Sequence, residues 1–183
     1  MTRLTFALLA GALAFGSHPA AGQDPASGLA ALDSLRAQRV SSASKYDQRQ
    51  IDAAASVSIV TRDEIQALGY QTLDEILKNQ IGFYSGNDRQ YSDIGVRGLG
   101  RPGHYNNRIL LLVDGHSLND DYSGGTRVGS AMAVDLDAVQ RVEIVRGPGS
   151  SLYGARAMLA VVNLVTRKGR DLDGTVADRK SVV

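Results

Sequence analysis

Residues 141–169 of the chain read RVEIVRGPGSSLYGARAMLAVVNLVTRKG, and this stretch decides which fold the sequence predicts. It starts with alternating apolar and polar residues around Val142, a pattern typical of a half-buried strand. A glycine-rich turn follows at residues 147–154. The apolar run from Val161 to Thr166 predicts a second strand. The stretch therefore predicts a strand, a glycine-rich turn, a segment of small residues and another strand, in that order.

Two helix starts of the same kind precede this stretch. Thr61 stands three residues before Glu64, and Thr72 stands three residues before Glu75. In such a capping box the threonine side chain accepts a hydrogen bond from a free backbone amide, and the glutamate reaches back to the threonine backbone. Apolar residues follow at helical spacing in both places. The sequence therefore predicts two short helices after a first strand that ends at Thr61.

Two further strands are expected in the middle of the chain. Residues 93–97 form a compact strand pattern, and residues 109–113 are five consecutive aliphatics. An uninterrupted aliphatic run of this length is typical of a strand that is buried on both faces. The pair Asp114 and Gly115 then predicts a tight hairpin turn.

The segments between these elements are polar or rich in glycine. Residues 84–92, 101–108 and 119–129 are expected to form loops, and long loops in compact domains are commonly functional. A short helix is expected at residues 135–140. The order of elements predicts an α+β fold, with a small mixed β-sheet, short helices and long glycine-rich loops.

Composition excludes several classes of protein. With 183 residues and 43% hydrophobic content, the chain can build one core. It has no cysteine, which excludes disulfides and thiolate metal sites. The 20 basic and 19 acidic residues nearly cancel, which argues against a nucleic-acid partner. His104 and His116 lie near aspartates, but the spacing of a calcium loop is not met, and no metal site is expected.

The N-terminal part predicts export. Residues 1–22 have a basic start, an apolar run too short to span a bilayer and a small-residue end, and they are expected to be a signal peptide. Residues 23–51 are polar and poor in large apolar side chains, which predicts a flexible N-terminal extension. The folded domain is expected to occupy residues 52–169.

Two motifs resemble nucleotide sites in spacing alone. Residues 98–103 match a dinucleotide fingerprint, but Pro102 breaks the helix that such a site requires. Residues 149–154 have the spacing of a phosphate loop, but Ala155 and Arg156 stand where lysine and a hydroxyl are needed. No base and nucleophile pair is visible either. The sequence therefore predicts no catalytic residues, no cofactor and no enzyme.

Tyrosines are unevenly spread, and four of them lie in the three polar loops, which also contain arginines. Tyrosine combines apolar contact with a polar tip and so suits a ligand surface, although tyrosines also pack on their own loops. Both interpretations stay open from the sequence. The candidate ligand-binding residues are Tyr84, Arg89, Tyr91, Arg101, Tyr105 and Tyr122.

Taken together, these ordered motifs resemble the plug domain of TonB-dependent outer-membrane receptors. The resemblance covers residues 41–169 and includes the closing stretch with its Arg-Gly-Pro, Ser-Leu-Tyr-Gly and Val-Asn motifs. The other matching motifs are Ser44-Lys45-Tyr46, residues 57–68, residues 73–77, Val96-Arg97-Gly98 and Leu112-Val113-Asp114-Gly115.

The resemblance implies a gate for transport. Receptors of this family hold the plug inside a barrel of about 22 strands in the outer membrane. The plug's outward loops help to bind a scarce nutrient complex such as an iron siderophore, haem or cobalamin. A short TonB box near the periplasmic N-terminus pairs with the TonB protein by strand addition, which delivers inner-membrane energy. The alternative is a free-standing periplasmic ligand-binding module of the same fold.

The resemblance also assigns roles to charged residues. Arg97, Arg141, Glu143 and Arg146 lie on or beside short strands, and enclosure by a barrel would give them partners on its wall. A solvated protein face is the alternative.

The chain departs from the family pattern in three ways, of which the smallest is that Arg156 and Ala160 stand where many relatives carry asparagine and glycine. No clear TonB box is visible between residues 23 and 44. Residues 170–183 are expected to begin the barrel region, with the remaining barrel, which would be this domain's own partner, missing from the chain. The last six residues, DRKSVV, are expected to be an artefact of sequencing.

Overall fold

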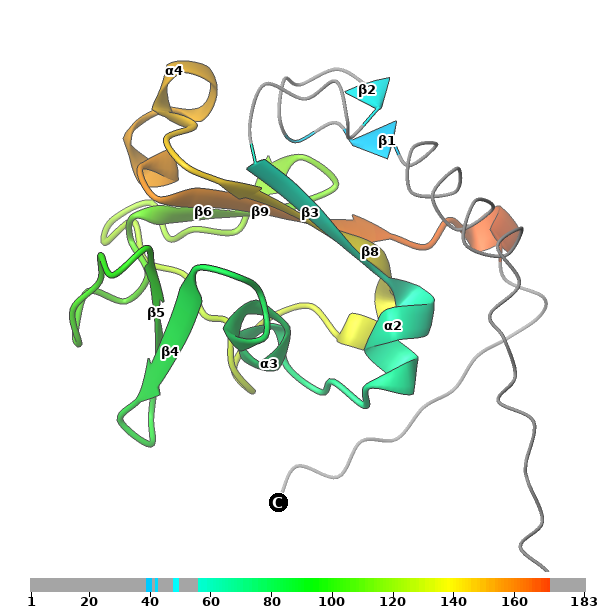
Figure 1. Cartoon of the computed structure of the whole chain (residues 1–183), viewed down its shortest axis with the longest axis horizontal. Coiled ribbons are helices and arrows are strands. Elements are labelled where there is room, and N and C mark those ends of the chain that lie inside the picture. Colours follow the sequence, from blue (N-terminus) through cyan, green and yellow to red (C-terminus); the bar gives the residue numbers. More distant parts are fainter. Residues whose placement is uncertain (1–38, 41, 43–47, 50–55, 172–183) are drawn as a thin grey trace, which may run out of the picture.

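The computed structural model describes residues 39–40, 42, 48–49 and 56–171. A five-stranded sheet with the order β3-β8-β9-β6-β7 lies at its centre (Figure 1). The strands β6 and β9 run parallel, and the other neighbours run antiparallel. This mixed sheet confirms the predicted α+β fold. The strands are β3 (Ser56–Thr61), β6 (Ile109–Val113), β7 (His116–Ser117), β8 (Val139–Arg146) and β9 (Ala160–Thr166).

Two short helices begin where the capping boxes predict them. The Glu64 amide donates to the Thr61 hydroxyl, and the Thr61 amide donates to the Glu64 carboxylate at 2.7 Å. Thr72 and Glu75 make the same reciprocal pair. Both capping boxes are therefore confirmed. The helices are α2 (Arg62–Ala67) and α3 (Leu73–Lys78).

The helices and a two-stranded hairpin cover one face of the central sheet (Figure 1). The hairpin consists of β4 (Phe83–Asn87) and β5 (Ser92–Val96). The main core fills the space between these layers, with Val142 and Ile144 of β8 and Ile76 of α3 fully buried. Alternate residues of a strand point to opposite faces, so the other face carries a second, smaller apolar group. Its members are Leu110, Leu112, Val145, Ala157 and Val161.

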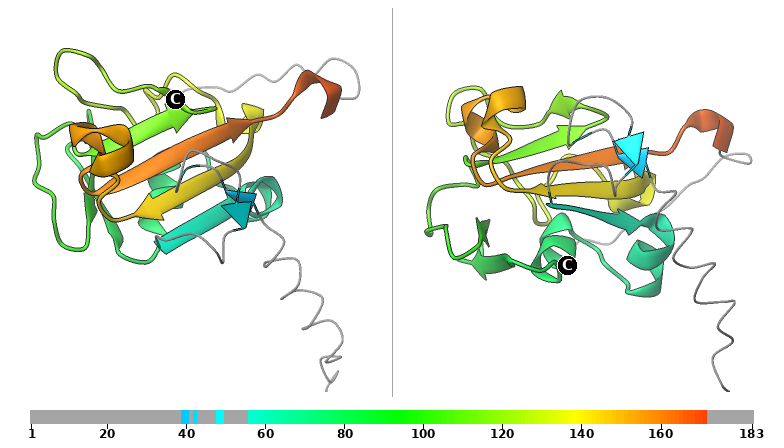
Figure 2. Two further views of the ribbon diagram at one scale, coloured as in Figure 1. Left: turned by 90° about the horizontal axis from the view of Figure 1, so that it is seen from above. Right: turned by 45° about the horizontal axis from the view of Figure 1, so that its top comes forward.

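A short pair of strands lies over this second face, as the turned views show (Figure 2). Its strands are β1 (Arg39–Val40) and β2 (Gln48–Arg49), which pair antiparallel. Because apolar residues of β6 face both cores, four of its five residues are buried. This burial confirms the prediction for residues 109–113. The turn at Asp114 and Gly115 joins β6 to β7 as the predicted hairpin.

Three segments differ from the expectation. Residues 83–87 form strand β4 rather than the start of a loop, because they pair in register with β5. At residues 135–140 there is only a 3₁₀ turn before β8 begins at Val139. The small-residue segment contains helical turns that the sequence did not predict. The short turns are η2 (Leu136–Ala138), α4 (Ser150–Tyr153), η3 (Ala155–Ala157) and η4 (Gly169–Asp171).

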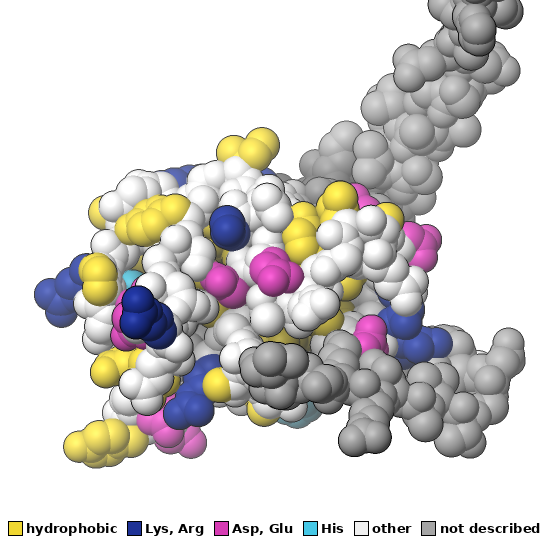
Figure 3. All heavy atoms as spheres, turned by 90° about the horizontal axis from the view of Figure 1, so that it is seen from below, with side chains coloured by type: hydrophobic (Ala, Val, Ile, Leu, Met, Phe, Trp, Pro, Cys, Tyr) yellow, Lys and Arg dark blue, Asp and Glu magenta, His cyan; other side chains and the backbone are white. Residues whose placement is uncertain are grey.

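The surface over the helices and the β4–β5 hairpin carries mixed charge. Figure 3 shows basic and acidic side chains interspersed on this face, with apolar side chains between them. A continuous basic stripe is the usual footprint of a nucleic-acid site, and the mixed pattern differs from it. Within the described residues, none of the helices is both long and apolar enough to cross a membrane.

Candidate functional site

Three loops meet at the end of the sheet where β8 finishes and β9 begins. The rings of Tyr91 and Tyr105 contact each other edge to face, with centroids 5.2 Å apart and an interplanar angle of 81°. The guanidinium of Arg127 lies 5.7 Å from the centroid of the Tyr91 ring. Both geometries are favourable, since aromatic edges and cations are attracted to the electron-rich face of a ring. We call these three residues the Tyr91 cluster.

A buried asparagine holds the loops of the Tyr91 cluster together. The side-chain amide of Asn106 donates to the carbonyl oxygens of Ser92 at 2.8 Å and Thr126 at 3.0 Å. Its side-chain oxygen accepts from the Ile94 amide at 2.7 Å. Only 1% of Asn106 is exposed, so these bonds are shielded from competing water. The loops that carry Tyr91, Tyr105 and Arg127 are thus fixed to one another.

A second asparagine fixes the loop after β7. Asn119 accepts from the Leu111 amide at 2.8 Å and donates to the carbonyl oxygens of Ile109 and Gly124. Next to it, the Asp120 carboxylate accepts from the amide and hydroxyl of Ser123. These bonds, first of all the one from the Ser123 amide, lower the pKa of Asp120. The loop is therefore an ordered turn beside the Tyr91 cluster.

Two hollows border the Tyr91 cluster. The larger is about 520 Å³ and is lined by Tyr91, Tyr105, Asp120 and Arg127, among others. The smaller is about 80 Å³ and includes Arg89 in its lining. The structure thus brings the predicted residues Arg89, Tyr91 and Tyr105 together. Arg127 was missed by the sequence analysis, because nothing in its local sequence separates it from other loop arginines.

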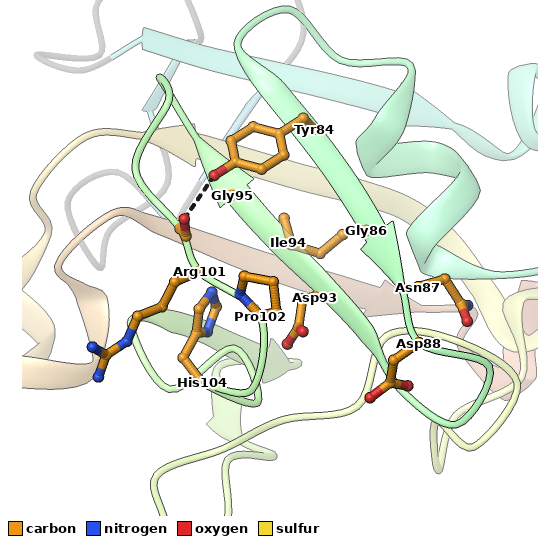
Figure 4. Close-up of a pocket in the computed structure, with 11 residues that line it drawn as sticks. Tyr84, Gly86, Asn87, Asp88, Asp93, Ile94, Gly95, Arg101, Pro102 and His104 are labelled. Carbon is orange, nitrogen blue, oxygen red and sulfur yellow. Dashed lines mark hydrogen bonds between the residues drawn. The ribbon is translucent and has the colours of Figure 1, made fainter.

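Tyr84 and Arg101 belong to a neighbouring hollow of about 260 Å³ (Figure 4). The Tyr84 ring lies across the backbone of Gly95, and its hydroxyl donates to the Gly100 carbonyl at 3.0 Å. Tyr122 lines none of these three hollows and is fully exposed at the tip of its loop. The predicted ligand residues therefore divide into two adjacent groups and one isolated tyrosine.

No three side chains of the metal-ligating types gather into a candidate metal site within the part of the chain that the structure describes. His104 lies in the 260 Å³ hollow, where its Nδ1 accepts from the Asn106 amide at 3.0 Å. Its Nε2 is buried and, among the described residues, has no hydrogen-bond partner. The histidine thus supports the loop backbone.

The charged residues that were predicted to contact a barrel wall lie in two separate places. Arg146 donates from Nη1 to the Ile81 carbonyl and from Nε to the Ser56 hydroxyl, both at 3.1 Å. The exposed Arg97 is attached to the same turn, because its amide donates to the Gly82 carbonyl at 2.7 Å. Ile81 between them is 86% exposed. We call Ile81, Arg97 and Arg146 the arginine patch.

Arg141 and Glu143 lie further along β8, on the second face of the sheet. Arg141 Nη2 forms an ion pair with Glu143 Oε1 at 2.8 Å. Glu143 is fully buried, whereas a third of the Arg141 side chain is exposed. The Glu143 carboxylate also accepts hydrogen bonds from Ser42. These contacts place Glu143 inside the domain.

The described part of the chain is thus a mixed sheet covered on one face by two capped helices, with loops at one end that carry tyrosines and arginines. The family model for the TonB-dependent Receptor Plug Domain matches residues 49–161. This match covers more than half of the chain. The chain therefore belongs to the TonB-dependent receptor plug family.

Named relatives agree with this family. The iron-regulated outer membrane virulence protein of Vibrio cholerae is 32% identical over 133 residues, which are 70% of this chain and 20% of that protein. The vitamin B12 transporter BtuB of Vibrio vulnificus is 29% identical over 140 residues, which are 75% of this chain and 22% of that protein. The chain thus spans about a fifth of the length of these relatives. Family and relatives are receptors and transporters, not enzymes.

Solved receptors share the fold. FpvA of Pseudomonas aeruginosa in complex with a pyoverdine and iron superposes with a TM-score of 0.58 at 21% identity, covering 74% of this chain and 17% of that one. The siderophore receptor PirA of Acinetobacter baumannii gives a TM-score of 0.51 at 25% identity, covering 66% of this chain and 18% of that one.

Proposed function

We propose that the chain acts as the gate of an outer-membrane receptor that takes up a scarce nutrient complex. The cargo class is an iron siderophore, haem or cobalamin. The plug would sit in the barrel lumen with its N-terminus in the periplasm, where TonB would supply inner-membrane energy. Membership of the plug family carries this proposal. Relatives named for iron regulation and for vitamin B12 transport support the cargo class.

The ligand would bind on the loops that meet at the Tyr91 cluster. Aromatic rings provide a large contact area at a low entropic cost, and arginines provide charge and directed hydrogen bonds. The 520 Å³ hollow beside Tyr105 and Arg127 offers a concave surface for a part of such a ligand. Tyr84, Arg89, Arg101 and Tyr122 would extend the contact around it.

The arginine patch would make the contact with the wall of the enclosing barrel. Exposed apolar and cationic groups side by side suit an interface whose partner offers carboxylates and apolar side chains. Arg146 is already held by two hydrogen bonds, so little side-chain entropy would be lost on contact. Arg141, which is partly exposed on the second face, would provide a further contact.

Replacing Tyr105 and Tyr122 together by alanine in the complete receptor tests the ligand surface. Both side chains are exposed, so the fold should survive their loss. Binding of the cargo, chosen from a panel of ferric siderophores, haem and cyanocobalamin, should weaken by about tenfold or more, because removing aromatic anchors commonly costs over 1 kcal/mol. Leu68→Ala is the control, since it removes an exposed side chain from the end of α2. Unchanged affinity in the double variant would exclude these tyrosines from the ligand site.

A further inference from the structure

Two polar atoms at the 260 Å³ hollow lack a hydrogen-bond partner. Among the described residues, Oδ1 of Asp93 and Nε2 of His104 are the two buried side-chain atoms without one. Both residues line the hollow, and His104 is only 7% exposed (Figure 4). Buried polar atoms are nearly always paired in folded proteins, so two unpaired atoms at one hollow require a physical explanation.

The hydrogen bonds that the two side chains do make determine what each unpaired atom can offer. Nδ1 of His104 accepts from the Asn106 amide at 3.0 Å, so the proton of the neutral ring lies on Nε2, which is a donor. Oδ2 of Asp93 accepts from the Gly103 amide at 3.0 Å, which leaves Oδ1 as a free acceptor. Gly103 directly precedes His104, so the two side chains are neighbours in the lining of the hollow.

A donor beside an acceptor favours a neutral ligand group. A ligand carboxylate would accept from His104 but would face the carboxylate of Asp93, and a ligand ammonium would donate to Asp93 but offer no acceptor to His104. A hydroxyl or a carboxamide can donate to the one and accept from the other. Tyr84, Ile94 and Pro102 add apolar surface to the lining, which suits a carbon ring or chain that carries such a group.

We propose that Asp93 and His104 form a binding site for the hydroxyl or carboxamide of a neutral ligand group with an apolar skeleton. Both unpaired atoms are buried in the free domain, so a small side-chain movement accompanies binding. This chemistry differs from that of the Tyr91 cluster, where Arg127 supplies a positive charge. In a receptor the group would be a neutral arm of the cargo, an assignment that rests on the proposed function.

Three probes with the same ring and different charges test the site, namely cyclohexanol, cyclohexanecarboxylate and cyclohexylammonium. Each is titrated into the purified chain and followed by NMR of the Gly103 and Asn106 amides, which donate to the two side chains. Cyclohexanol should shift both signals and bind about tenfold or more tightly than either charged probe, because each charged probe leaves one buried atom unpaired. Equal binding of the three probes, or no shift with cyclohexanol, would overturn the proposal.

Asp93→Asn should change which probe is preferred. The Gly103 amide still requires an oxygen, so the new side-chain nitrogen takes the place of Oδ1, and the hollow then offers two donors. Cyclohexanecarboxylate should become the tightest of the three probes. Asp88→Asn is the matched control, because Asp88 lines the same hollow, but its Oδ1 already accepts from the Gln90 and Tyr91 amides. This variant loses the same charge and should keep the original order of affinities.

An unchanged order of affinities in Asp93→Asn would also overturn the proposal. If that variant fails to fold, the order of the three probes on the original chain decides the question alone. Since no barrel, TonB or cargo is involved, a negative result leaves the proposed transport function untouched. Conversely, a failure of the transport function leaves the result with the three probes standing.

Discussion

Gly95→Ala should destabilise the domain by displacing Tyr84. A Cβ on residue 95 would lie 2.0 Å from Cζ of Tyr84 and 2.3 Å from its hydroxyl oxygen, which no real contact permits. The ring would have to leave the backbone of β5 and give up its hydrogen bond to Gly100. The close approach of the Tyr84 ring to the backbone therefore explains why residue 95 is a glycine.

The contribution of Tyr84 sets the size of this effect. Its hydrogen bond is worth about 1 kcal/mol. Tyr84 is 42% exposed. Slightly more than half of the side chain is therefore buried, and this burial contributes about 1 to 1.5 kcal/mol to the free energy of unfolding. The expected loss in the free energy of unfolding is about 2 kcal/mol, since the ring can escape toward solvent instead of straining the hairpin.

Urea denaturation followed by circular dichroism would measure this loss in a double-mutant cycle with Tyr84→Ala. Once the ring is gone, Gly95→Ala should cost less than about 0.5 kcal/mol, so that most of its effect appears as coupling. Gly86→Ala in the paired strand is the matched control, because no atom lies within 4 Å of the position that the added methyl group would take. Equal costs of Gly95→Ala with and without Tyr84 would refute the reasoning.

Three further outcomes are expected. Asn106→Ala should lower the free energy of unfolding in urea by about 3 kcal/mol or more, since it leaves three buried backbone groups unpaired. Asn106→Gly suits the positive φ of 59° at this position and should recover only a small part of that loss. Full recovery would show that the backbone conformation, and not the hydrogen bonds, is what Asn106 provides. Because the pKa of Asp120 is lowered, its carboxylate stabilises the loop fully above the unfolded pKa of 3.8, and this contribution is lost as the pH falls through the lower folded pKa. An NMR titration of the Ser123 amide would reveal this loss, and an amide signal unchanged between about pH 5 and pH 2 would contradict it. The pKa of Tyr153 is raised, first by burial and then by the charge of Glu143, so the neutral phenol stabilises the folded state below the unfolded value of 10.0 and this contribution is lost at higher pH. Glu143→Gln should lower the Tyr153 pKa, as measured by NMR of labelled tyrosine. An unchanged pKa would mean that Glu143 lies too far away to affect it.

Elements specified by neighbouring residues were predictable from the sequence. The two capping boxes satisfy backbone amides within a single turn, so Thr61 and Thr72 identify the helix starts without any tertiary information. The aliphatic run at residues 109–113 likewise carries its own signal, because burial on both faces removes polar alternation.

Features made by distant residues were not predictable. Strand β4 shows no clear alternation, since most of its residues are exposed and only its pairing with β5 defines it. Arg127 joins Tyr91 and Tyr105 because Asn106 ties three separate loops together. Glu143 was expected to contact a barrel wall, and the structure pairs it with Arg141 and with Ser42, which lies 101 residues away in the sequence. Such pairings leave no trace in local sequence spacing.

Reading the genomic DNA downstream of the codon for Ala177 tests whether this domain is part of a receptor, because a plug has its function only inside one. We expect an open reading frame that continues with segments of about ten residues, each alternating between apolar and polar positions, in the number needed for a barrel of about 22 strands. An in-frame stop codon shortly after this point, with no such segments encoded, would contradict the account.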